Sequence, residues 1–94
     1  MEVKQSSADK KGMFYIEDHE KKQAMMTYTF IDASGFSIDH TVVQPGNEGK
    51  GLGKMLVKAA VDFARANHLK ILPICPYAKS VFDKTAEYKD ILIN

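Results

Sequence analysis

The chain has little cysteine, no excess of charge and no long apolar run, and each of these shortages excludes a class of protein. Its single cysteine, Cys75, cannot form a disulfide within the chain. The formal net charge is +1 and lysines alternate with acids, so we expect no nucleic-acid partner. No segment reaches the roughly 18 apolar residues of a membrane span, and none follows a basic start as in a signal peptide. We therefore expect no membrane partner and a cytoplasmic location.

The chain is also too short for a separate substrate domain. Its 94 residues, 45% hydrophobic and 27% charged, are enough for one small globular domain with one core. Residues 1–12 are polar and are expected to form a poorly ordered N-terminal segment, and residues 13–94 are expected to form the single domain. Binding and any chemistry must therefore share one core.

Apolar residues in the first half of the chain follow the two-residue period of β-strands. Residues 13–17 are apolar and β-rich, residues 18–22 form a polar turn, and residues 36–43 follow a second turn at 33–35. The intervening strand places four apolar residues on one face: Ala24, Met26, Tyr28 and Phe30. These patterns predict an antiparallel meander of three strands.

The period changes after the glycines, where apolar residues recur at three- and four-residue steps. This pattern predicts an amphipathic helix that ends at Asn67, a plausible left-handed terminator. The β-rich residues 69–75 follow closely, so the two strands that flank the helix should be parallel. Pro73 cannot donate to a strand ladder and predicts a bulge or a splayed edge, and residues 78–88 predict a short helix. The expected fold is α/β, of the α+β type, with a mostly antiparallel sheet and one strand-helix-strand crossover.

The most informative segment joins the third strand to this helix and reads Val-Val-Gln-Pro-Gly-Asn-Glu-Gly-Lys-Gly-Leu-Gly over residues 42–53. Glycines let the backbone approach an anion closely, and the unpaired N–H groups at a helix start favour negative charge. The segment therefore predicts a pyrophosphate cradle. A nucleotide-hydrolysing P-loop would need Gly-Lys and a hydroxyl residue where Gly51-Leu52 stands. A dinucleotide fingerprint fails as well, because Gly49, Gly51 and Gly53 have the wrong last interval.

Three segments make the chain resemble the GCN5-related N-acetyltransferases, and more closely their very small single-domain members. They are Asp39-His40-Thr41-Val42-Val43, Glu48-Gly49-Lys50-Gly51-Leu52-Gly53 and Ile74-Cys75-Pro76-Tyr77. The resemblance covers residues 13–88 and implies that acetyl-coenzyme A is the cosubstrate, bound at the splayed opening of the sheet. The family's loop pattern is Gln/Arg-x-x-Gly-x-Gly/Ala, so Glu48 removes one side-chain donor while Gly51 and Gly53 match.

The resemblance also implies which residues contact the coenzyme. The backbone amides of the loop hold the pyrophosphate, and the pantetheine arm pairs with the strand backbone near Val42 and Val43. Lys50 and Lys54 either meet the phosphates or are ordinary solvated lysines. The coenzyme-binding residues expected on this basis are Val42, Val43, Glu48, Gly49, Lys50, Gly51, Leu52, Gly53 and Lys54.

Three residues are candidates for the chemistry, and each has a structural alternative. His40 is either the general base or an exposed strand histidine. Cys75 is either a nucleophile that accepts the acyl group or a small core residue, and His40 could be its base if the strands bring the two together. Tyr77 either protonates the leaving thiolate or is a core or lid residue. No metal is expected, because His19, His40 and Cys75 lack the close spacing of ligands.

The expected activity is transfer of an acetyl group to an amine of a small molecule or a protein. The transfer is either direct, with His40 as base, or passes through an acyl-Cys75. Full-length members of the family have acceptor-binding helices between their first strands, whereas this chain has only residues 18–22 there. A non-catalytic acyl-coenzyme A sensor or adaptor therefore remains the alternative function. The unpaired outer strand is compatible with a monomer or a weak homodimer.

Overall fold

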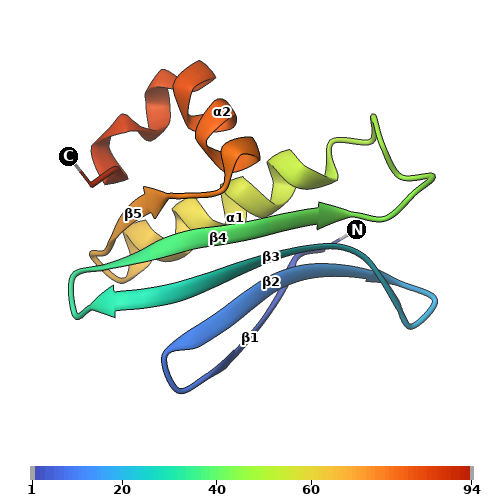
Figure 1. Ribbon diagram of the computed structural model, residues 1–94, viewed down its shortest axis with the longest axis horizontal. Coiled ribbons are helices and arrows are strands. Elements are labelled where there is room, and N and C mark those ends of the chain that lie inside the picture. Colours follow the sequence, from blue (N-terminus) through green and yellow to red (C-terminus); the bar gives the residue numbers. More distant parts are fainter. Residues whose placement is uncertain (1, 94) are drawn as a thin grey trace.

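The computed structural model describes residues 2–93, so residues 1 and 94 of the two expected segments lie outside the described residues. It contains a five-stranded sheet in the order β1-β2-β3-β4-β5, with helices on one side (Figure 1). The first four strands pair antiparallel, and β5 joins β4 in parallel after the crossover helix α1. This arrangement confirms the predicted fold class. The elements are β1 (Lys4–Ala8), β2 (Lys11–Asp18), β3 (Lys21–Asp32), β4 (Gly35–Val43), α1 (Leu52–Ala66), β5 (Lys70–Pro73), α2 (Pro76–Lys84) and the 3-10 helix η1 (Ala86–Ile91).

The N-terminal residues differ from the expectation of a poorly ordered segment. Lys4–Ala8 forms the edge strand β1, which pairs antiparallel with β2 from Lys4 opposite Tyr15 to Ala8 opposite Lys11. All five of its side chains are exposed, so the strand has no apolar alternation that the sequence could reveal. Backbone pairing with β2, rather than burial, holds it in place.

The hydrophobic core lies between the sheet and α1. The predicted face of β3 is confirmed, because Ala24, Met26 and Tyr28 are buried there and Phe30 packs against the same core. The helix contributes five fully buried side chains, and its Phe63 ring joins an aromatic cluster with the strands. Within residues 2–93, no helix crosses the opposite face of the sheet (Figure 1). The five buried helix residues are Leu56, Val57, Ala60, Val61 and Ala64.

The ends of α1 agree with the sequence prediction except for one residue. The helix ends at Ala66, and Asn67 follows with a φ of −114°, so Asn67 is not the left-handed terminator. The left-handed residue is His68, with a φ of 56°. The side-chain amide of Asn67 instead donates to the carbonyl of Phe63 at 2.9 Å. Asn67 therefore caps the helix end through its side chain.

Pairing between β4 and β5 stops halfway along β4. The ladder runs from Gly35 opposite Lys70 to Ile38 opposite Pro73. Pro73 has no N–H, and the amides of both Ile74 and Cys75 donate to the Ile38 carbonyl at 3.0 Å. The chain then turns away into α2. The second half of β4 is therefore left without a neighbour on this side, which is the splayed opening that Pro73 predicted.

The hairpin between β2 and β3 is tight. His19 and Glu20 both have positive φ, at 52° and 65°, and the pairing begins again at Lys21. A connection this short leaves the helix-free face of the sheet open near the splayed strands.

In the described part of the chain, no helix combines the length and the apolar character that a membrane span requires.

Candidate active site

The loop between β4 and α1 is built on three glycines in the left-handed region. Gly46, Gly49 and Gly51 have φ values of 92°, 80° and 77°, which favour glycine over any residue with a Cβ. Gly51 is the N-cap residue of α1, no side chain caps this helix, and its first turn has no acidic residue. The first N–H groups of α1 and the positive end of its dipole therefore remain available to an anion from outside the chain.

Glu48, the residue that departs from the family's loop pattern, bonds within its own loop. Its Oε2 accepts a hydrogen bond from the Gly46 amide at 2.8 Å. The Asn47 side chain donates to Oε1 of Gln23 at 2.7 Å, which ties the loop to β3, and Lys50 Nζ donates to Oδ1 of Asn47 at 3.4 Å. These contacts hold the loop in shape, so Glu48 stabilises the turn whose amides the sequence assigned to an anion.

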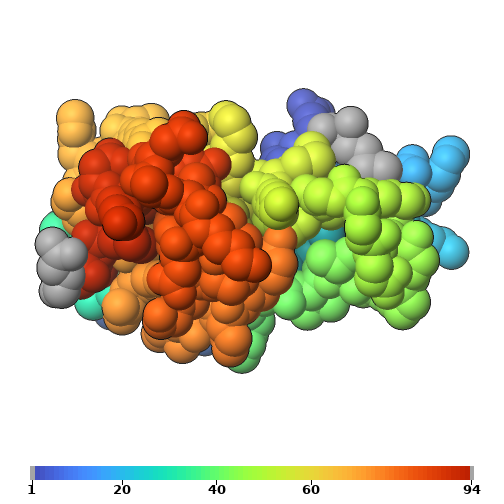
Figure 2. Space-filling model, turned by 90° about the horizontal axis from the view of Figure 1, so that it is seen from above, coloured from blue at the N-terminus to red at the C-terminus, as the bar shows by residue number. Residues whose placement is uncertain are grey.

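An open cleft of about 400 Å³ lies between this loop, the end of β4 and the start of α2. In Figure 2 the loop, in green, and α2, in orange, lie on either side of the start of α1. The cleft brings together the predicted coenzyme-binding residues except Val42 and Lys50, and it adds Asn47 and Tyr77. Its lining consists of Val43, Asn47, Glu48, Gly49, Gly51, Leu52, Gly53, Lys54 and Tyr77.

Gly53 is required for a different reason than Gly51. Its φ is not positive, but a Cβ at this position would lie 2.5 Å from the hydroxyl oxygen of Tyr77. The Tyr77 ring therefore lies directly against the first turn of α1. Burial, and secondarily the negative charge of Cys75, raise the pKa of Tyr77 above its usual value. The hydroxyl remains protonated at neutral pH and can donate a proton or a hydrogen bond into the cleft.

The second half of β4 offers backbone groups to the same cleft. The Gln44 amide donates to the Gln23 carbonyl of β3 at 2.9 Å. Backbone groups alternate in direction along a strand, so those of Val42 also point toward β3, while those of Thr41 and Val43 point toward the open edge. The Val42 side chain is 45% exposed on the helix-free face, across the strand from Met25. The edge next to the cleft therefore has backbone donors and acceptors at Thr41 and Val43.

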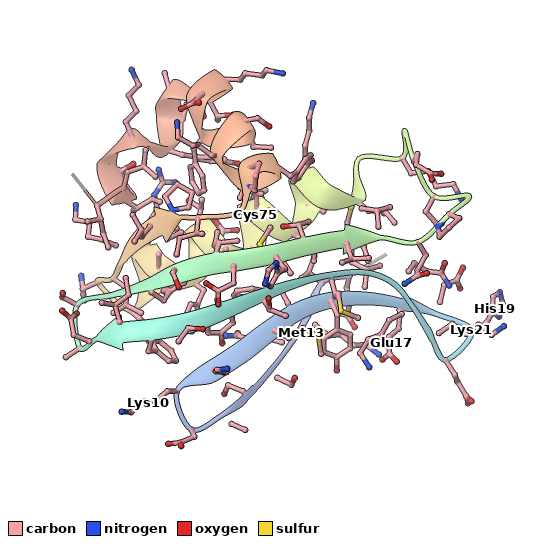
Figure 3. The ribbon with its side chains drawn as sticks, in the orientation of Figure 1. Lys10, Met13, Glu17, His19, Lys21 and Cys75 are labelled. Atoms are coloured by element: carbon pink, nitrogen blue, oxygen red, sulfur yellow. The ribbon has the colours of Figure 1, made fainter. Side chains whose placement is uncertain are left out.

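Cys75 is the N-cap residue of α2 and is buried, with 5% of its surface exposed, and it does not line the cleft although Tyr77 two residues later does. Its Sγ lies 3.4 Å from Oγ1 of Thr41, and Figure 3 shows the side chain above β4 at the foot of α2. Burial alone would raise the pKa of the thiol, but the Thr41 hydroxyl and the amides of Ala78, Tyr77 and Thr41 outweigh it. The pKa of Cys75 is therefore lowered, and the thiolate becomes easier to form.

His40 lies on the other face of the sheet. It is exposed and stands opposite Thr27 of β3, whereas Thr41 stands opposite the buried Met26. Among residues 2–93, no hydrogen bond joins His40 to Cys75, so the structure does not form the His40–Cys75 pair that the sequence left open. The two residues instead flank the splayed opening from opposite faces.

Within residues 2–93, no three His, Cys, Asp or Glu side chains lie close enough together to hold a metal ion. His19 lies on the β2–β3 turn, and Figure 3 shows this turn at the far end of the hairpin from Cys75. His19 therefore lies far from Cys75.

The sequence did not single out Thr41 or Asp39. Thr41 follows His40 directly, but a register shift between Thr27 and Tyr28 places an extra residue in β4, so that Ile38 and Thr41 share one face. Simple alternation counted from Ile38 would have put His40 on the core face and Thr41 on the opposite, helix-free face. A bulge of this kind has no reliable sequence signal, so the contact between Thr41 and Cys75 could be found only from the structure.

Comparisons with known proteins agree with this geometry. The sequence profile described as GCN5-related N-acetyl-transferase matches residues 13–91. The solution structure of a GCN5-like putative N-acetyltransferase from Staphylococcus aureus is 39% identical, with 99% of this chain and 88% of that chain covered and a TM-score of 0.75. No curated protein sequence matches the chain.

Two more distant structures share the fold alone. A ribosomal-protein-alanine N-acetyltransferase from Brucella melitensis biovar Abortus is 15% identical, with 82% of this chain and 62% of that chain covered and a TM-score of 0.68. An aminoglycoside N-acetyltransferase in complex with CoA is 11% identical, with 82% and 67% covered and a TM-score of 0.61. With the profile match and the S. aureus relative spanning most of the sequence, the chain belongs to the GCN5-related N-acetyltransferase family and is an acetyltransferase.

Proposed function

We propose that the chain binds acetyl-coenzyme A in the cleft between the glycine loop and α2 and transfers the acetyl group to an amine of a small molecule or a protein. One observation carries the proposal: the open edge of β4 leads directly to the uncapped start of α1. A ligand with an amide-containing arm and a pyrophosphate needs this combination, a free strand edge followed by an anion site. A distant structure of the same fold, an aminoglycoside N-acetyltransferase, was solved in complex with CoA, which supports a ligand of this kind.

Each part of the cleft has a proposed role. The amides of the first turn of α1 and the Lys54 side chain hold the pyrophosphate, and the Thr41 and Val43 backbones pair with the amide arm. Contacts of Val42 and Lys50 with the coenzyme remain predictions, because neither residue lines the cleft.

The direct route uses both faces of the splayed opening. The acetyl acceptor approaches from the helix-free face, where His40 takes the proton of the amine. The nitrogen forms a bond to the carbonyl carbon, the bond from that carbon to sulfur breaks, and Tyr77 donates a proton to the departing sulfur. The exposed position of His40 and the raised pKa of Tyr77 support these assignments.

A route through acyl-Cys75 is the second candidate, and the lowered pKa of this thiol favours it. In this route the thiolate attacks the thioester carbon, and the acceptor amine attacks the resulting acyl-cysteine in a second step. Cys75 would not depend on His40 as a base, because Thr41 and the start of α2 already favour its thiolate. The two routes predict different consequences for Cys75→Ala and His40→Gln.

Coenzyme binding is tested by calorimetric titration with acetyl-coenzyme A. Gly51→Val places a β-branched residue at a φ of 77° in the cleft and is expected to weaken binding on the order of tenfold or more. Gly46→Val is a matched control, because Gly46 has a similar φ and equally open space around it but does not line the cleft. Equal affinities of the two variants, or no binding by the unmodified protein, would contradict the proposed site.

Turnover is tested on the same samples by thiol release with a panel of primary amines and by intact mass. On the direct route, His40→Gln lowers turnover on the order of a hundredfold without weakening coenzyme binding, and Cys75→Ala still turns over. An added acetyl group that disappears in Cys75→Ala, together with lost turnover, would establish the covalent route. Binding without turnover of any amine would favour the sensor or adaptor function.

The cellular setting is part of the proposal. A cytoplasmic location is supported by the single cysteine and by the absence of an internal disulfide framework. A monomer or weak homodimer is supported by β1, whose exposed outer edge can pair with a second copy.

A further inference from the structure

A second hollow, of about 460 Å³, lies on the helix-free face of the sheet. It contains His40 of β4 and Ile74, the residue directly after β5, so it reaches the point where these two strands separate. This is the side from which the proposed acetyl acceptor approaches. The full lining consists of Lys11, Gly12, Thr27, Tyr28, Thr29, Asp39, His40 and Ile74.

Asp39 is the charged residue of this hollow whose side chain is fixed by hydrogen bonds to its neighbours. Its Oδ2 accepts a hydrogen bond from the Thr29 hydroxyl at 2.6 Å, and its Oδ1 accepts one from the Ser37 hydroxyl at 2.7 Å. Ser37 is itself 5% exposed, so the carboxylate is held in one orientation from below. Each carboxylate oxygen has room for a further hydrogen bond.

This carboxylate has no cationic partner within the described chain. Among residues 2–93, no Lys, Arg or His nitrogen lies within 4.0 Å of Asp39, whereas other acids such as Asp62, Asp83 and Asp90 each pair with a basic side chain. A half-buried and fixed carboxylate without a counter-ion is a strong site for an ammonium group.

The unpaired hydroxyl of Thr27 is a second, independent indication that the hollow binds a ligand. Its Oγ1 is buried without a hydrogen-bond partner, and no other buried side-chain oxygen or nitrogen in the described chain shares this condition. Thr27 lies directly opposite His40 across β3 and β4 and lines the same hollow. A buried hydroxyl without a partner costs about 1–3 kcal/mol, a penalty that is removed when the side chain turns toward an N–H donor bound in the hollow.

We propose that this hollow binds the primary ammonium of the acetyl acceptor, with Asp39 as the specificity-determining carboxylate and Thr27 as a second hydrogen-bond acceptor. The inference rests on the proposed transfer reaction and names its substrate class. The ammonium bound at Asp39 lies beside His40, which takes one of its protons before the nitrogen attacks the thioester carbon and the coenzyme sulfur leaves with a proton. Lys11 also lines the hollow and repels a second positive charge, so the site favours amines with a single charge, such as a lysine side chain.

The structural alternative is that Asp39 only fixes the bulge of β4. In that case Asp39→Asn would change stability and leave ligand binding unaffected. Thr27→Val separates the two explanations, because it keeps the shape of the side chain and removes a hydroxyl that bonds to nothing in the described chain. The proposal predicts that Thr27→Val keeps or gains stability and loses affinity for the ammonium.

The experiment is a titration of ¹⁵N-labelled protein with Nα-acetyl-lysine amide, followed by the backbone amide signals of Asp39, His40 and Ile74. We expect saturable shifts at these residues, and none with Nα-acetyl-norleucine amide, which lacks the ammonium. Asp39→Asn should weaken binding on the order of tenfold, and Thr27→Val by a smaller factor. Asp83→Asn, which removes a surface carboxylate of α2, should bind like the unmodified protein.

Equal binding by Asp39→Asn, or equal shifts with the norleucine amide, would overturn the proposal. If Asp39→Asn does not fold, Thr27→Val decides alone, and unchanged binding by this folded variant would also overturn it. The titration contains no coenzyme, so it is independent of the calorimetric test of the cleft. Ammonium binding without coenzyme binding would defeat the proposed function alone, and coenzyme binding without ammonium binding would defeat this inference alone.

Discussion

The two halves of β4 differ in what surrounds them. The first half, Gly35–Ile38, has a strand on each side and is buried throughout. The second half, residues 39–43, has a strand on one side only, and its side chains are exposed or half-buried. A strand with two neighbours has its backbone groups satisfied within the sheet, whereas a strand with one neighbour has groups left for a ligand. The first half therefore supports the fold, and the second half is where both proposed ligands meet.

Pro73 is the residue at which the two halves become different. It is the last residue of β5 to pair with β4, and it has no N–H to continue the ladder. The chain then enters α2 with Pro76 in the first turn, which is a favoured position for proline, and with Cys75 as the N-cap. Because β5 separates from β4 after Pro73, the edge of the second half of β4 is open and Cys75 lies beside Thr41.

The largest effect is expected from truncation in the buried half of β4. Phe36 is fully buried and its ring centroid lies 5.2 Å from that of Tyr28 and 5.7 Å from that of Phe63. Phe36→Ala should lower the free energy of unfolding by about 3–5 kcal/mol, because it removes this packing and leaves a cavity. Val42→Ala in the open half should change it by no more than about 0.5 kcal/mol. Urea unfolding followed by circular dichroism measures both.

The comparison fails if the two variants lose similar stability. A large loss in Val42→Ala would mean that the helix-free face is covered in solution, for example by a second copy of the chain. Measuring the unfolding midpoint at two protein concentrations separates this case, because only association makes the midpoint depend on concentration.

The sequence could predict the elements that build the hydrophobic core because burial imposes a period. The alternation of Ala24, Met26 and Tyr28 and the helical spacing after Gly51 follow directly from one buried face. The edge strand Lys4–Ala8 could not be predicted in this way, because none of its residues is buried. Backbone pairing with β2 and side-chain contacts such as the bond from Gln5 to the Tyr28 hydroxyl stabilise it.

A smaller effect is expected from Gly53→Ala, at the start of α1 beside the open half. The added Cβ would lie 2.5 Å from the Tyr77 hydroxyl oxygen and within 2.7 Å of ring carbons, so the ring must move. Such overpacking costs about 1–3 kcal/mol. Tyr77→Ala removes the obstacle, so the double variant should be less destabilised than the two single effects added together. Urea unfolding of all four proteins measures this coupling.

Additive effects of Gly53→Ala and Tyr77→Ala would contradict the contact and would leave the cleft without its wall on the α2 side. Gly49→Ala is a useful control, because its positive φ of 80° strains the new residue although nothing lies within 4 Å of the Cβ. Its effect should be independent of Tyr77.

The candidate site was predictable as far as it depends on glycine and on chain order. Gly51 and Gly53 were identified from spacing, but the sequence could not show that Gly51 is needed for its φ and Gly53 for the approach of Tyr77. The role of Asp39 was hidden for a similar reason. Its contacts depend on a bulge and on hydroxyls of two strands, and pairing register between strands is not encoded by any short motif.

The smallest effect is expected on the pKa of Cys75, whose sulfur contacts Thr41 in the open half of β4. Burial opposes ionisation of this thiol, and the Thr41 hydroxyl is the first of the groups that favour its charged form and lower its pKa. Thr41→Val removes that hydroxyl and keeps the burial, so the pKa of Cys75 should rise. The ultraviolet absorbance of the thiolate should then appear at higher pH than in the unmodified protein. Thr27→Val, on the opposite face, should leave this titration unchanged, and an unchanged profile in Thr41→Val would assign the lowered pKa to the backbone amides of Ala78, Tyr77 and Thr41.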